Sequence, residues 1–580
     1  MTAPDEPVRI ATEWFAAYSD ALQSGKPEAV AASFLPQGWL RDALTFTWDT
    51  RSLEGREKIT NYLSETLATA KIHGLKMDDD LYFRPAYFQF GPFQGISFGY
   101  SFETPIALGR GFVQLFPEGG GEQWKAQVVS IMLTDLKGHE EQGRTNYEDV
   151  VNGRTWGEYR AEYEAKVQSD PYVIVIGAGQ VGLQVAARFK QNDIPTLVVE
   201  RNNRVGDNWR KRYDSLALHT IPEHHQMLYQ PLPTNWPKYP PRDRVAGLLE
   251  TYVTTQELTV WTRSYPVGRP VYSPEAKRWT VVISHDGQEV ELHPAHIVLA
   301  TGTLGAPHIP SYADRDVFKG PVIHSTAYAN PTPFKGKDVV VVGSGQSAVD
   351  ICEDLAKAGI SVTMIQRAPT TVSGRDWEMA NVVSLSFPKG VPAEVMDFKF
   401  ASMPRGHLCN MIMSKEAMAV YVAAQADLHA KLRKAGVILN LEKPQAVLWF
   451  ERMGGYWMDK GSADLFASGD IKVKAGVEPT AYTSTGFRLS DGSELRADAI
   501  ILATGYLNMR EVNKTLFGAD VIDKTSAVWG MDEEGEICGS YRPSGYPGLW
   551  YASGDFYNAR YGSKHLALQI KAIALGLHSQ

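Results

Sequence analysis

The sequence predicts an α/β protein in which two similar parallel-sheet domains follow a smaller α+β domain. Two glycine-rich loops, at Gly177 and Gly343, each follow a run of apolar residues that suits a buried parallel strand. The tripeptide Ala-Thr-Gly recurs at residues 300–302 and 503–505, again after an apolar strand. Residues 1–165 lack both features. We therefore expect two Rossmann-type dinucleotide-binding domains behind a separate N-terminal domain.

Length and composition indicate a globular protein of several domains. The chain has 580 residues, which suggests about three or four domains, and 44% are hydrophobic and 21% charged. A net charge of −8 argues against nucleic acid as a partner, because phosphate binding needs clustered Lys and Arg. No stretch suits a signal peptide or a membrane span, so a cytoplasmic protein is expected. Cys352, Cys409 and Cys538 are too scattered for a disulfide framework or a zinc site, and no metal is predicted.

Residues 1–165 predict helices followed by a curved antiparallel sheet. Helical spacing covers 10–22, 27–34 and 55–67, and strands are expected at 43–48, 87–90, 95–102, 109–116 and 124–132. This order, with Trp39–Leu44 and Gly55–Ile59, resembles the NTF2-like (SnoaL-like) α+β cone. A polar linker at 137–146 and a helix at 159–166 should follow.

Such a cone can hold a small-molecule site, which Trp39, Asp42, Trp48 and Asp49 could line. We favour the alternative that these residues fill the core or an interface, because a fold does not imply a function. The domain could also join copies of the chain into a homo-oligomer.

The first glycine loop is expected to bind a dinucleotide. A strand at 172–176 leads into Gly177, Gly179 and Gly182, and a helix at 183–189 follows. Glycines let the backbone approach a pyrophosphate, and the helix N-terminus supplies positive potential. The next strand, 195–200, ends at Glu200, 23 positions after Gly177, where a carboxylate can accept the ribose hydroxyls.

The second loop repeats this plan in a longer domain. A strand at 338–342 precedes Gly343-Ser344-Gly345-Gln346-Ser347. Asp286-Gly287 and Asp491-Gly492 stand at matching places and predict type I′ hairpins. From loop glycine to Ala-Thr-Gly glycine the second copy spans 162 residues against 125. This difference predicts an insertion at about 375–470, which contains a helix at 415–428.

The residue that ends the second strand distinguishes the two nucleotides. Glu200 suits a free ribose and repels a 2′-phosphate, whereas Arg367, 24 positions after Gly343, offers a charged donor fork that fits one. The first site therefore suits FAD and the second NADPH.

Between the two copies, Phe318-Lys-Gly320-Pro-Val-Ile-His324-Ser-Thr-Ala-Tyr328 matches the Phe-x-Gly-x-x-x-His-x-x-x-Tyr signature of class B flavoprotein monooxygenases. With both loops and Ala503–Tyr506, residues 170–580 resemble the flavin-containing monooxygenase family, including its YUCCA-like branch. The resemblance implies four segments: an N-terminal domain with linker (1–165), the first part of an FAD domain (166–335), an NADPH domain (336–500) and the C-terminal part of the FAD domain (501–580).

The resemblance also implies cofactor contacts. The FAD set comprises Gly177, Gly179, Gln180, Gly182, Glu200, Arg201, Asn208, Trp209, His219, Thr301 and Asp555. The NADPH set comprises Gly343, Ser344, Gly345, Gln346, Ser347, Arg367 and Thr504. Residues 300–305 and 503–507 would be the two crossings between the domains.

The activity implied is monooxygenation that depends on FAD and NADPH. NADPH reduces FAD, and the reduced flavin takes up O₂ as a C4a-(hydro)peroxide that transfers one oxygen atom to a small organic substrate. His219, Thr220 and Asn208 are candidate catalytic residues, although His219 could instead only hydrogen-bond the backbone, and Trp209 could only pack on the flavin. His324 is expected to be structural or to contact the other domain.

Three alternatives remain open. A Baeyer–Villiger enzyme acting on a ketone shares the cofactors, but its signature favours Trp followed by Pro or Asp where this chain has Tyr328-Ala329. A dithiol flavin reductase needs a neighbouring cysteine pair, which is absent from the sequence. A non-catalytic flavin-binding scaffold is the third.

Two regions are expected to shape access for the substrate. They are the proline-rich stretch 231–241 and the insertion, whose Trp377, Phe398, Phe400, Met403 and Met411 suggest an apolar substrate or, equally, core packing.

Overall fold

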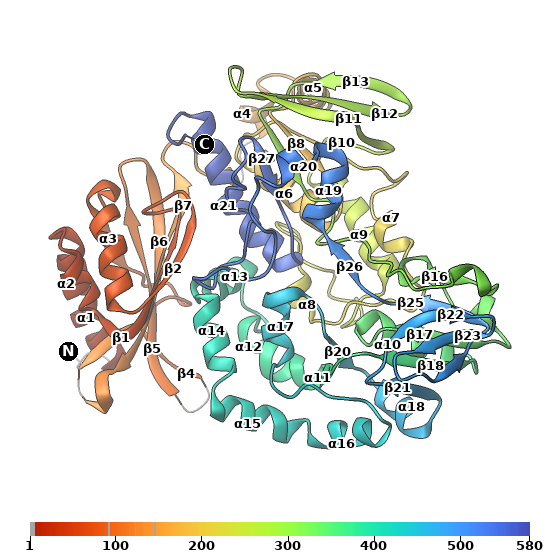
Figure 1. The fold of residues 1–580 in the computed structure, drawn as a ribbon. Coiled ribbons are helices and arrows are strands. Elements are labelled where there is room, and N and C mark those ends of the chain that lie inside the picture. The colour runs from red at the N-terminus through yellow and green to blue at the C-terminus, as the bar shows by residue number, and fades with distance from the viewer. Residues whose placement is uncertain (1–5, 91–92, 122, 144–146, 580) are drawn as a thin grey trace.

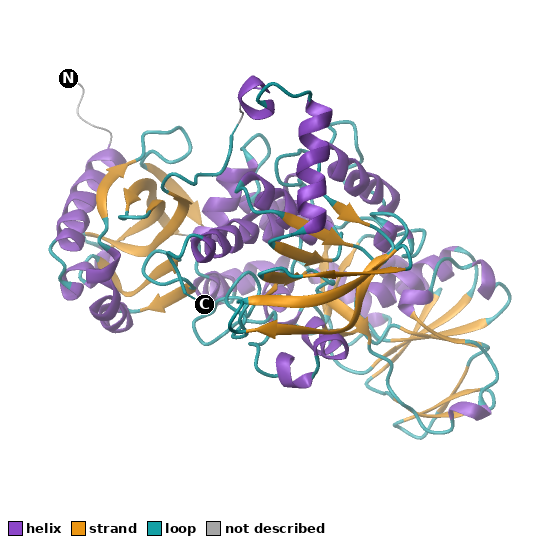
Figure 2. Cartoon of the chain, turned by 90° about the horizontal axis from the view of Figure 1, so that it is seen from above, coloured by secondary structure: helices purple, strands orange, loops and turns teal. Residues whose placement is uncertain are grey.

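The structure is a computed structural model that describes residues 6–90, 93–121, 123–143 and 147–579. Two segments on which predictions were made lie outside the described residues. They are residues 1–5, which belong to the N-terminal segment predicted to lack a signal peptide, and residues 144–146 of the predicted linker. Figures 1 and 2 show the N-terminal domain as a separate body at one end of the molecule, with its helices on the side away from the rest of the chain.

The N-terminal domain packs three helices on a seven-stranded sheet. Trp14, Phe15 and Tyr18 of α1 (Glu6–Gln23) lie against Phe98 and Tyr100 in its core. The other helices are α2 (Pro27–Ala31) and α3 (Arg56–Ala70). The strands are β1 (Phe34–Ala43), β2 (Thr50–Glu54), β3 (His73–Met77), β4 (Ala86–Phe90), β5 (Phe93–Glu103), β6 (Ala107–Pro117) and β7 (Trp124–Leu136), in the order β2-β1-β7-β6-β5-β3 with β4 beside β5.

The four later strands predicted for this domain are confirmed, but the prediction of a strand at 43–48 is wrong. The strand β1 ends at Ala43, and Leu44 has a φ of 66°. The Asp42 carboxylate accepts hydrogen bonds from the backbone N–H groups of Thr45, Phe46 and Thr47, so it turns the chain where a strand was expected. Its hydrogen bonds replace the ladder of a strand.

A first parallel sheet has the order β10-β9-β8-β14-β27. Its strands are β8 (Val173–Ile176), β9 (Thr196–Val199), β10 (Val260–Trp261), β14 (His296–Leu299) and β27 (Leu549–Tyr551). The helices α6 (Gln180–Gln191), α9 (Arg242–Thr255) and α21 (Phe556–Ala574) share its core. The C-terminal segment therefore returns to the sheet that begins at residue 173.

A second parallel sheet has the order β16-β25-β17-β18-β21. Its strands are β16 (Val322–His324), β17 (Asp338–Val342), β18 (Ser361–Gln366), β21 (Ile471–Ala475) and β25 (Ala499–Leu502), and α10 (Gln346–Lys357) and α18 (Ser462–Ser468) pack on it. The predicted boundary at 335/336 leaves β16 in the first domain, whereas β16 pairs with β25 in the second sheet.

Each parallel sheet carries a three-stranded antiparallel sheet. They are β11 (Ser264–Ser273), β12 (Arg278–His285) and β13 (Gln288–Leu292), and β22 (Pro479–Thr483), β23 (Gly486–Leu489) and β24 (Glu494–Arg496). Asp286 and Gly287 both have positive φ, 49° and 84°, as the predicted type I′ turn requires. The second type I′ prediction is wrong: only Gly492 of its dipeptide has a positive φ, and the Leu489 N–H donates to Ser493 across a longer loop.

The insertion forms a helical layer between the N-terminal domain and the second sheet (Figure 1). It holds β19 (Thr371–Gly374), β20 (Tyr456–Asp459), α11 (Arg375–Glu378), α12 (Ser384–Ser386), α13 (Ala393–Ser402), α14 (Arg405–Ile412), α15 (Lys415–Ala424), α16 (Ala426–Lys434) and α17 (Gln445–Arg452). The single helix predicted at 415–428 is two helices, divided at Gln425, whose side chain accepts from the Gly374 N–H at 2.9 Å.

Short elements complete the chain. They are α4 (Tyr147–Val151), α5 (Trp156–Ser169), which contains the predicted helix 159–166, α7 (Asp207–Arg210), α8 (Pro222–His225), β15 (Leu304–Pro307), β26 (Tyr506–Asn508), α19 (Met509–Phe517) and α20 (Ala519–Ile522). None of the helices in the described ranges is long and apolar enough to cross a membrane.

The four residues proposed to line a site in the cone lie in the core or at contacts with the rest of the chain. Trp39 packs against His407 of α14, and Trp48 stacks on His578 with ring centroids 5.0 Å apart. Asp49 accepts from Arg542 at 2.7 Å, and Asp42 is fully buried. This placement agrees with the interpretation that they fill the core or an interface.

Candidate active site

A cavity of about 2990 Å³ opens at the carboxyl ends of both parallel sheets. Residues that follow β8, β9 and β14 form one side of it, and residues that follow β17, β18 and β25 form the other. The insertion and part of the N-terminal sheet complete its wall. Open α/β sheets bind ligands at this edge.

The two glycine loops have nearly the same geometry. Gly177 has a φ of 110°, and a Cβ there would lie 2.4 Å from the Ala300 carbonyl oxygen. Gly343 has a φ of 123°, and a Cβ there would lie 2.3 Å from the Ala503 carbonyl oxygen. Both positions therefore require glycine, and each loop is held against its own Ala-Thr-Gly segment.

Each loop ends at the N-terminus of a helix. Gly179 and Gly345 are the N-cap residues of α6 and α10, and neither helix has a side-chain cap. The first-turn amides are therefore open to an anion from the cavity. Gly182 does not line the cavity; a Cβ there would meet the Gly177 carbonyl oxygen at 1.9 Å, so this glycine lets α6 pack against the loop.

The two strand-end residues differ in how they are held. Glu200 is buried, and its carboxylate accepts from the Ala178 N–H at 2.9 Å and from the Asn202 side chain at 2.7 Å. Arg367 has a side chain that is 77% exposed, and its contact with Glu478 is 3.4 Å long. Glu200 is thus fixed beside the first loop, while Arg367 can turn toward an anionic group. Arg201 also lines the cavity.

His219 faces a buried carboxylate of the second domain. Its Nε2 lies 3.8 Å from Oδ2 of Asp350 on α10, which also accepts from Tyr213, Gln346 and Lys460. Burial lowers the pKa of His219, and Asp350 opposes this effect. His219 therefore links the two domains at the cavity.

Asn208 and Trp209 lie on α7 beside the first loop. The Asn208 amide nitrogen lies 3.5 Å from the position of a Cβ on Gly179. Trp209 donates to Gln180 at 3.4 Å and packs against the hydrophobic cores of both parallel sheets. Gln180 and Trp209 therefore form one wall at the junction of the domains.

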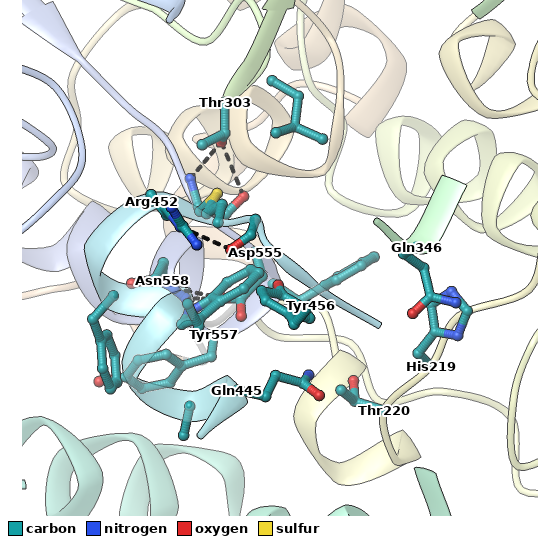
Figure 3. A pocket seen from close by; sticks show the side chains of 18 of the residues that line it. His219, Thr220, Thr303, Gln346, Gln445, Arg452, Tyr456, Asp555, Tyr557 and Asn558 are labelled. Atoms are coloured by element: carbon teal, nitrogen blue, oxygen red, sulfur yellow. Dashed lines mark hydrogen bonds between the residues drawn. The ribbon is translucent and has the colours of Figure 1, made fainter. Parts of the chain in front are cut away.

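Thr220 belongs to a hydrogen-bonded chain that the sequence did not reveal. Its Oγ1 lies 3.0 Å from His224 Nδ1 and also contacts His225 Nε2. His224 Nε2 lies 3.1 Å from Oδ2 of Asp555, the N-cap residue of α21. Figure 3 shows Thr220 and Asp555 at the same cavity. Thr220, His224 and Asp555 connect a loop of the first domain to its C-terminal segment.

The two predicted crossings lie side by side. β15 and β26 form an antiparallel pair, and Thr504 donates to the His308 carbonyl oxygen at 2.6 Å. Thr301 accepts from Asn513 at 3.1 Å. His324 of the signature contacts the Gly505 carbonyl oxygen at 3.0 Å, so it contacts a crossing rather than the interior of the cavity, as expected.

Phe318 and Tyr328, the ends of the signature, are buried. Phe318 stacks on Tyr482, and Tyr328 donates to Asp354 at 3.2 Å. Gly320 is required because a Cβ there would lie 2.4 Å from the Asp498 carbonyl oxygen. The ends of the signature therefore shape the start of the second domain, while Ser325 and Thr326 between them line the cavity.

The insertion contributes polar residues that sequence reasoning missed. Figure 3 shows Gln445, Arg452 and Tyr456 at the same cavity as Tyr557 and Asn558 of α21. Gln445 and Arg452 are the first and last residues of α17, and Tyr456 begins β20, so no single motif in the sequence marks the three residues together. His224-His225, four residues after Thr220, is the one signal that could have been followed.

Four of the five apolar residues that were named in the insertion lie at the cavity. Trp377, Phe400, Met403 and Met411 line the cavity, whereas Phe398 packs against Phe83 of the N-terminal domain. Residues 231–241 do not line the cavity, so the structure does not place them on an access route through it.

Comparisons with known proteins agree with this architecture. Residues 174–384 match the family described as pyridine nucleotide-disulphide oxidoreductase. Indole-3-pyruvate monooxygenase YUCCA1 of Oryza sativa subsp. japonica is 28% identical over 339 residues, 58% of this chain and 77% of that protein. The probable indole-3-pyruvate monooxygenase YUCCA4 of Arabidopsis thaliana is 29% identical over 343 residues, 58% of this chain and 75% of that protein. The chain is thus similar in sequence to two proteins named as indole-3-pyruvate monooxygenases.

Solved structures show the same fold. A steroid monooxygenase bound to NADP superposes with a TM-score of 0.51 at 19% identity, over 70% of this chain and 86% of that one. An open structure of cyclohexanone monooxygenase gives a TM-score of 0.51 at 15% identity, over 71% and 88%. The NTF2-like assignment of the N-terminal domain stays a prediction.

The three cysteines of this chain do not support disulfide chemistry. Cys352, Cys409 and Cys538 are free thiols, and none of them lines the cavity. Burial raises the pKa of Cys352 and of Cys409, the latter to about 11. A dithiol reductase needs a reactive thiolate pair at the flavin, so this alternative has no structural basis. A search of the described residues finds no group of side chains that could hold a metal ion.

Proposed function

We propose that this protein is a monooxygenase that uses FAD, NADPH and O₂ to insert one oxygen atom into a small organic substrate. The observation that carries the proposal is the pair of glycine loops, matched in geometry and open to one cavity, with Glu200 beside one loop and Arg367 beside the other. These features fit one dinucleotide with a free ribose and one with a 2′-phosphate.

The residues present fit both cofactors. FAD would lie against Gly177, Gly179 and Glu200, and NADPH against Gly343 and Arg367, with each pyrophosphate at an uncapped helix N-terminus. The nicotinamide supplies a hydride and the flavin supplies the oxygen chemistry when they are bound. The residue contacts stay predictions until a complex is examined.

The protein's own residues would position the reactants and exclude water. Trp209 packs between the two cores, and His219 lies 3.8 Å from Asp350 of the second domain. The insertion covers the cavity with Trp377, Phe400 and neighbouring apolar side chains. A dry, rigid site limits the loss of oxygen as hydrogen peroxide.

The wall of the cavity favours an apolar or aromatic substrate that also has a polar group. Apolar side chains of the insertion lie beside Gln445, Arg452 and Tyr456. The names of the plant relatives make indole-type keto acids the first compounds to test, and ketones test the Baeyer–Villiger alternative.

Purified protein would test this function directly. We expect a bound yellow flavin, oxidation of NADPH under air, and an oxygenated product with some compound of the panel. Absence of flavin after reconstitution with FAD would refute the proposal. Assembly into a homo-oligomer through the N-terminal domain stays a prediction, which sedimentation of the same sample would test.

A further inference from the structure

The chain Thr220, His224 and Asp555 is complete at the cavity. Thr220 Oγ1 lies 3.0 Å from His224 Nδ1, and His224 Nε2 lies 3.1 Å from Asp555 Oδ2. The other oxygen of Asp555, Oδ1, accepts from the N–H and the amide of Asn558 at 2.9 and 2.8 Å. All three residues of the chain line the cavity. They connect the Thr220 hydroxyl to the partly buried carboxylate of Asp555 through the imidazole ring of His224.

Asp555, whose side chain is 18% exposed at the cavity, stays ionised. Burial alone would raise the pKa of its carboxyl, but the His224 ring and the hydrogen bonds from His224 and Asn558 hold the pKa far below its usual range. An ionised carboxylate only accepts hydrogen bonds, so His224 Nε2 carries a hydrogen. His224 Nδ1 then decides the charge of the ring, and Nδ1 is the atom that faces Thr220.

Two other basic side chains lie near His224, and neither of them is a charged partner of Asp555. His225 lies beside the ring, and burial lowers its pKa, so it is neutral. Arg560 donates to the His224 carbonyl oxygen at 2.8 Å, but its charge is balanced by Asp397 in a buried ion pair. Among the described residues, the ion contact recorded for Asp555 is the one with His224.

We propose that Thr220, His224 and Asp555 form a proton relay that delivers a proton into the cofactor cavity at Thr220 Oγ1. The inference rests on the proposed function, because the reaction needs one proton: substrate, O₂, NADPH and H⁺ give oxygenated substrate, NADP⁺ and H₂O. Thr220 gives its hydroxyl hydrogen to the acceptor in the cavity and takes the Nδ1 proton of His224. The ring becomes neutral, keeps its Nε2 hydrogen on Asp555, and then regains from bulk solvent the one H⁺ that the net reaction consumes.

In this relay Thr220 touches the reactants, and His224 and Asp555 are positioning residues. Histidine suits the role because its ordinary pKa lies near neutral pH. The side chains around it are fixed, since Phe387 packs edge-on against its ring at 5.0 Å between centroids. Because the Thr220 hydroxyl passes the proton on, the His224 imidazole does not have to contact the substrate.

The first test needs no cofactor. Nitrogen-15 spectra of histidine-labelled protein, assigned with His224→Gln, report which ring nitrogen of His224 carries hydrogen at each pH. In Asp555→Asn the pH dependence of these signals should change, because the opposite charge beside the ring is lost. Identical His224 spectra in the wild type and in Asp555→Asn would overturn the relay.

The second test uses the flavin-loaded protein. Air oxidation of NADPH to H₂O₂ also consumes one proton, so its rate can be followed without a known substrate. His224→Gln and Thr220→Val should each lower this rate at least tenfold and remove the decline of the rate with rising pH. Thr220→Ser should restore both, and His293→Gln, on an exposed strand end, should match the wild type.

These outcomes separate the two proposals. Wild-type protein that binds no flavin or leaves NADPH unoxidised refutes the monooxygenase, while the histidine spectra still report on the relay pair. Wild-type oxidation with an unchanged pH profile in His224→Gln refutes the relay alone.

Discussion

The buried ion pair between Arg41 and Glu536 should decide whether the N-terminal domain stays docked. Arg41 Nε and Nη2 donate to the two carboxylate oxygens of Glu536 at 2.7 and 2.9 Å, and Ser52 adds a bond of 2.6 Å. The two side chains are 6% and 5% exposed. Arg41 lies on β1, and Glu536 lies in the loop that leads to β27 and Asp555.

Glu536→Gln leaves the Arg41 guanidinium buried without a counter-charge. Breaking such a pair from one side costs about 3–5 kcal/mol, which is a large part of the 5–15 kcal/mol that stabilises a typical fold. Replacing both residues, by Arg41→Met with Glu536→Leu, removes both charges and should recover most of that loss. The exposed pair Arg9–Glu13 provides the control, where Arg9→Ala should cost less than about 1 kcal/mol.

Thermal unfolding followed by tryptophan fluorescence would measure the effect, because Trp39 and Trp48 lie at the contact between the N-terminal domain and the rest of the chain. Proteolysis across residues 137–143 would report undocking separately. A Glu536→Gln protein that melts like the Arg9 control, or a double variant no more stable than the single one, contradicts the reasoning.

Three further predictions follow from single positions. Arg367→Ala should raise the KM for NADPH but not for NADH, by about 1–3 kcal/mol in binding free energy, and equal effects on both would remove the 2′-phosphate role. Gly343→Ala should abolish NADPH binding because its Cβ would lie 2.3 Å from the Ala503 carbonyl oxygen, whereas Gly247→Ala, which meets nothing within 4 Å, should bind normally in calorimetry. Burial raises the pKa of Asp42 from 3.8 to about 6, so the folded state binds the proton more tightly and stability should fall as pH rises between these values. Melting curves of Asp42→Asn over that range should lose the decline.

Sequence reasoning reached the parts of the site that depend on local backbone geometry. The spacing of Gly177 and Gly343 after apolar strands located both loops, and the structure places them at one cavity. It failed where distant segments meet. His224 contacts Asp555 across more than three hundred residues, and β16 joins a strand that lies far downstream. No local pattern encodes such contacts.

The sequence by itself determined the two nucleotide loops, the contrast of Glu200 with Arg367 and the order of the domains. These features follow from glycine torsion angles, strand hydrophobicity and side-chain charge, which are properties of a few neighbouring residues. The tertiary structure alone decided that the N-terminal sheet closes part of the cavity, that His219 lies beside Asp350, and that Thr220 is connected through His224 to the Asp555 carboxylate. Each of these features depends on packing between segments that are remote in the chain. Burial and the geometry of the partner set the charge of an ionisable group, and the residues next to that group in the sequence determine neither of them.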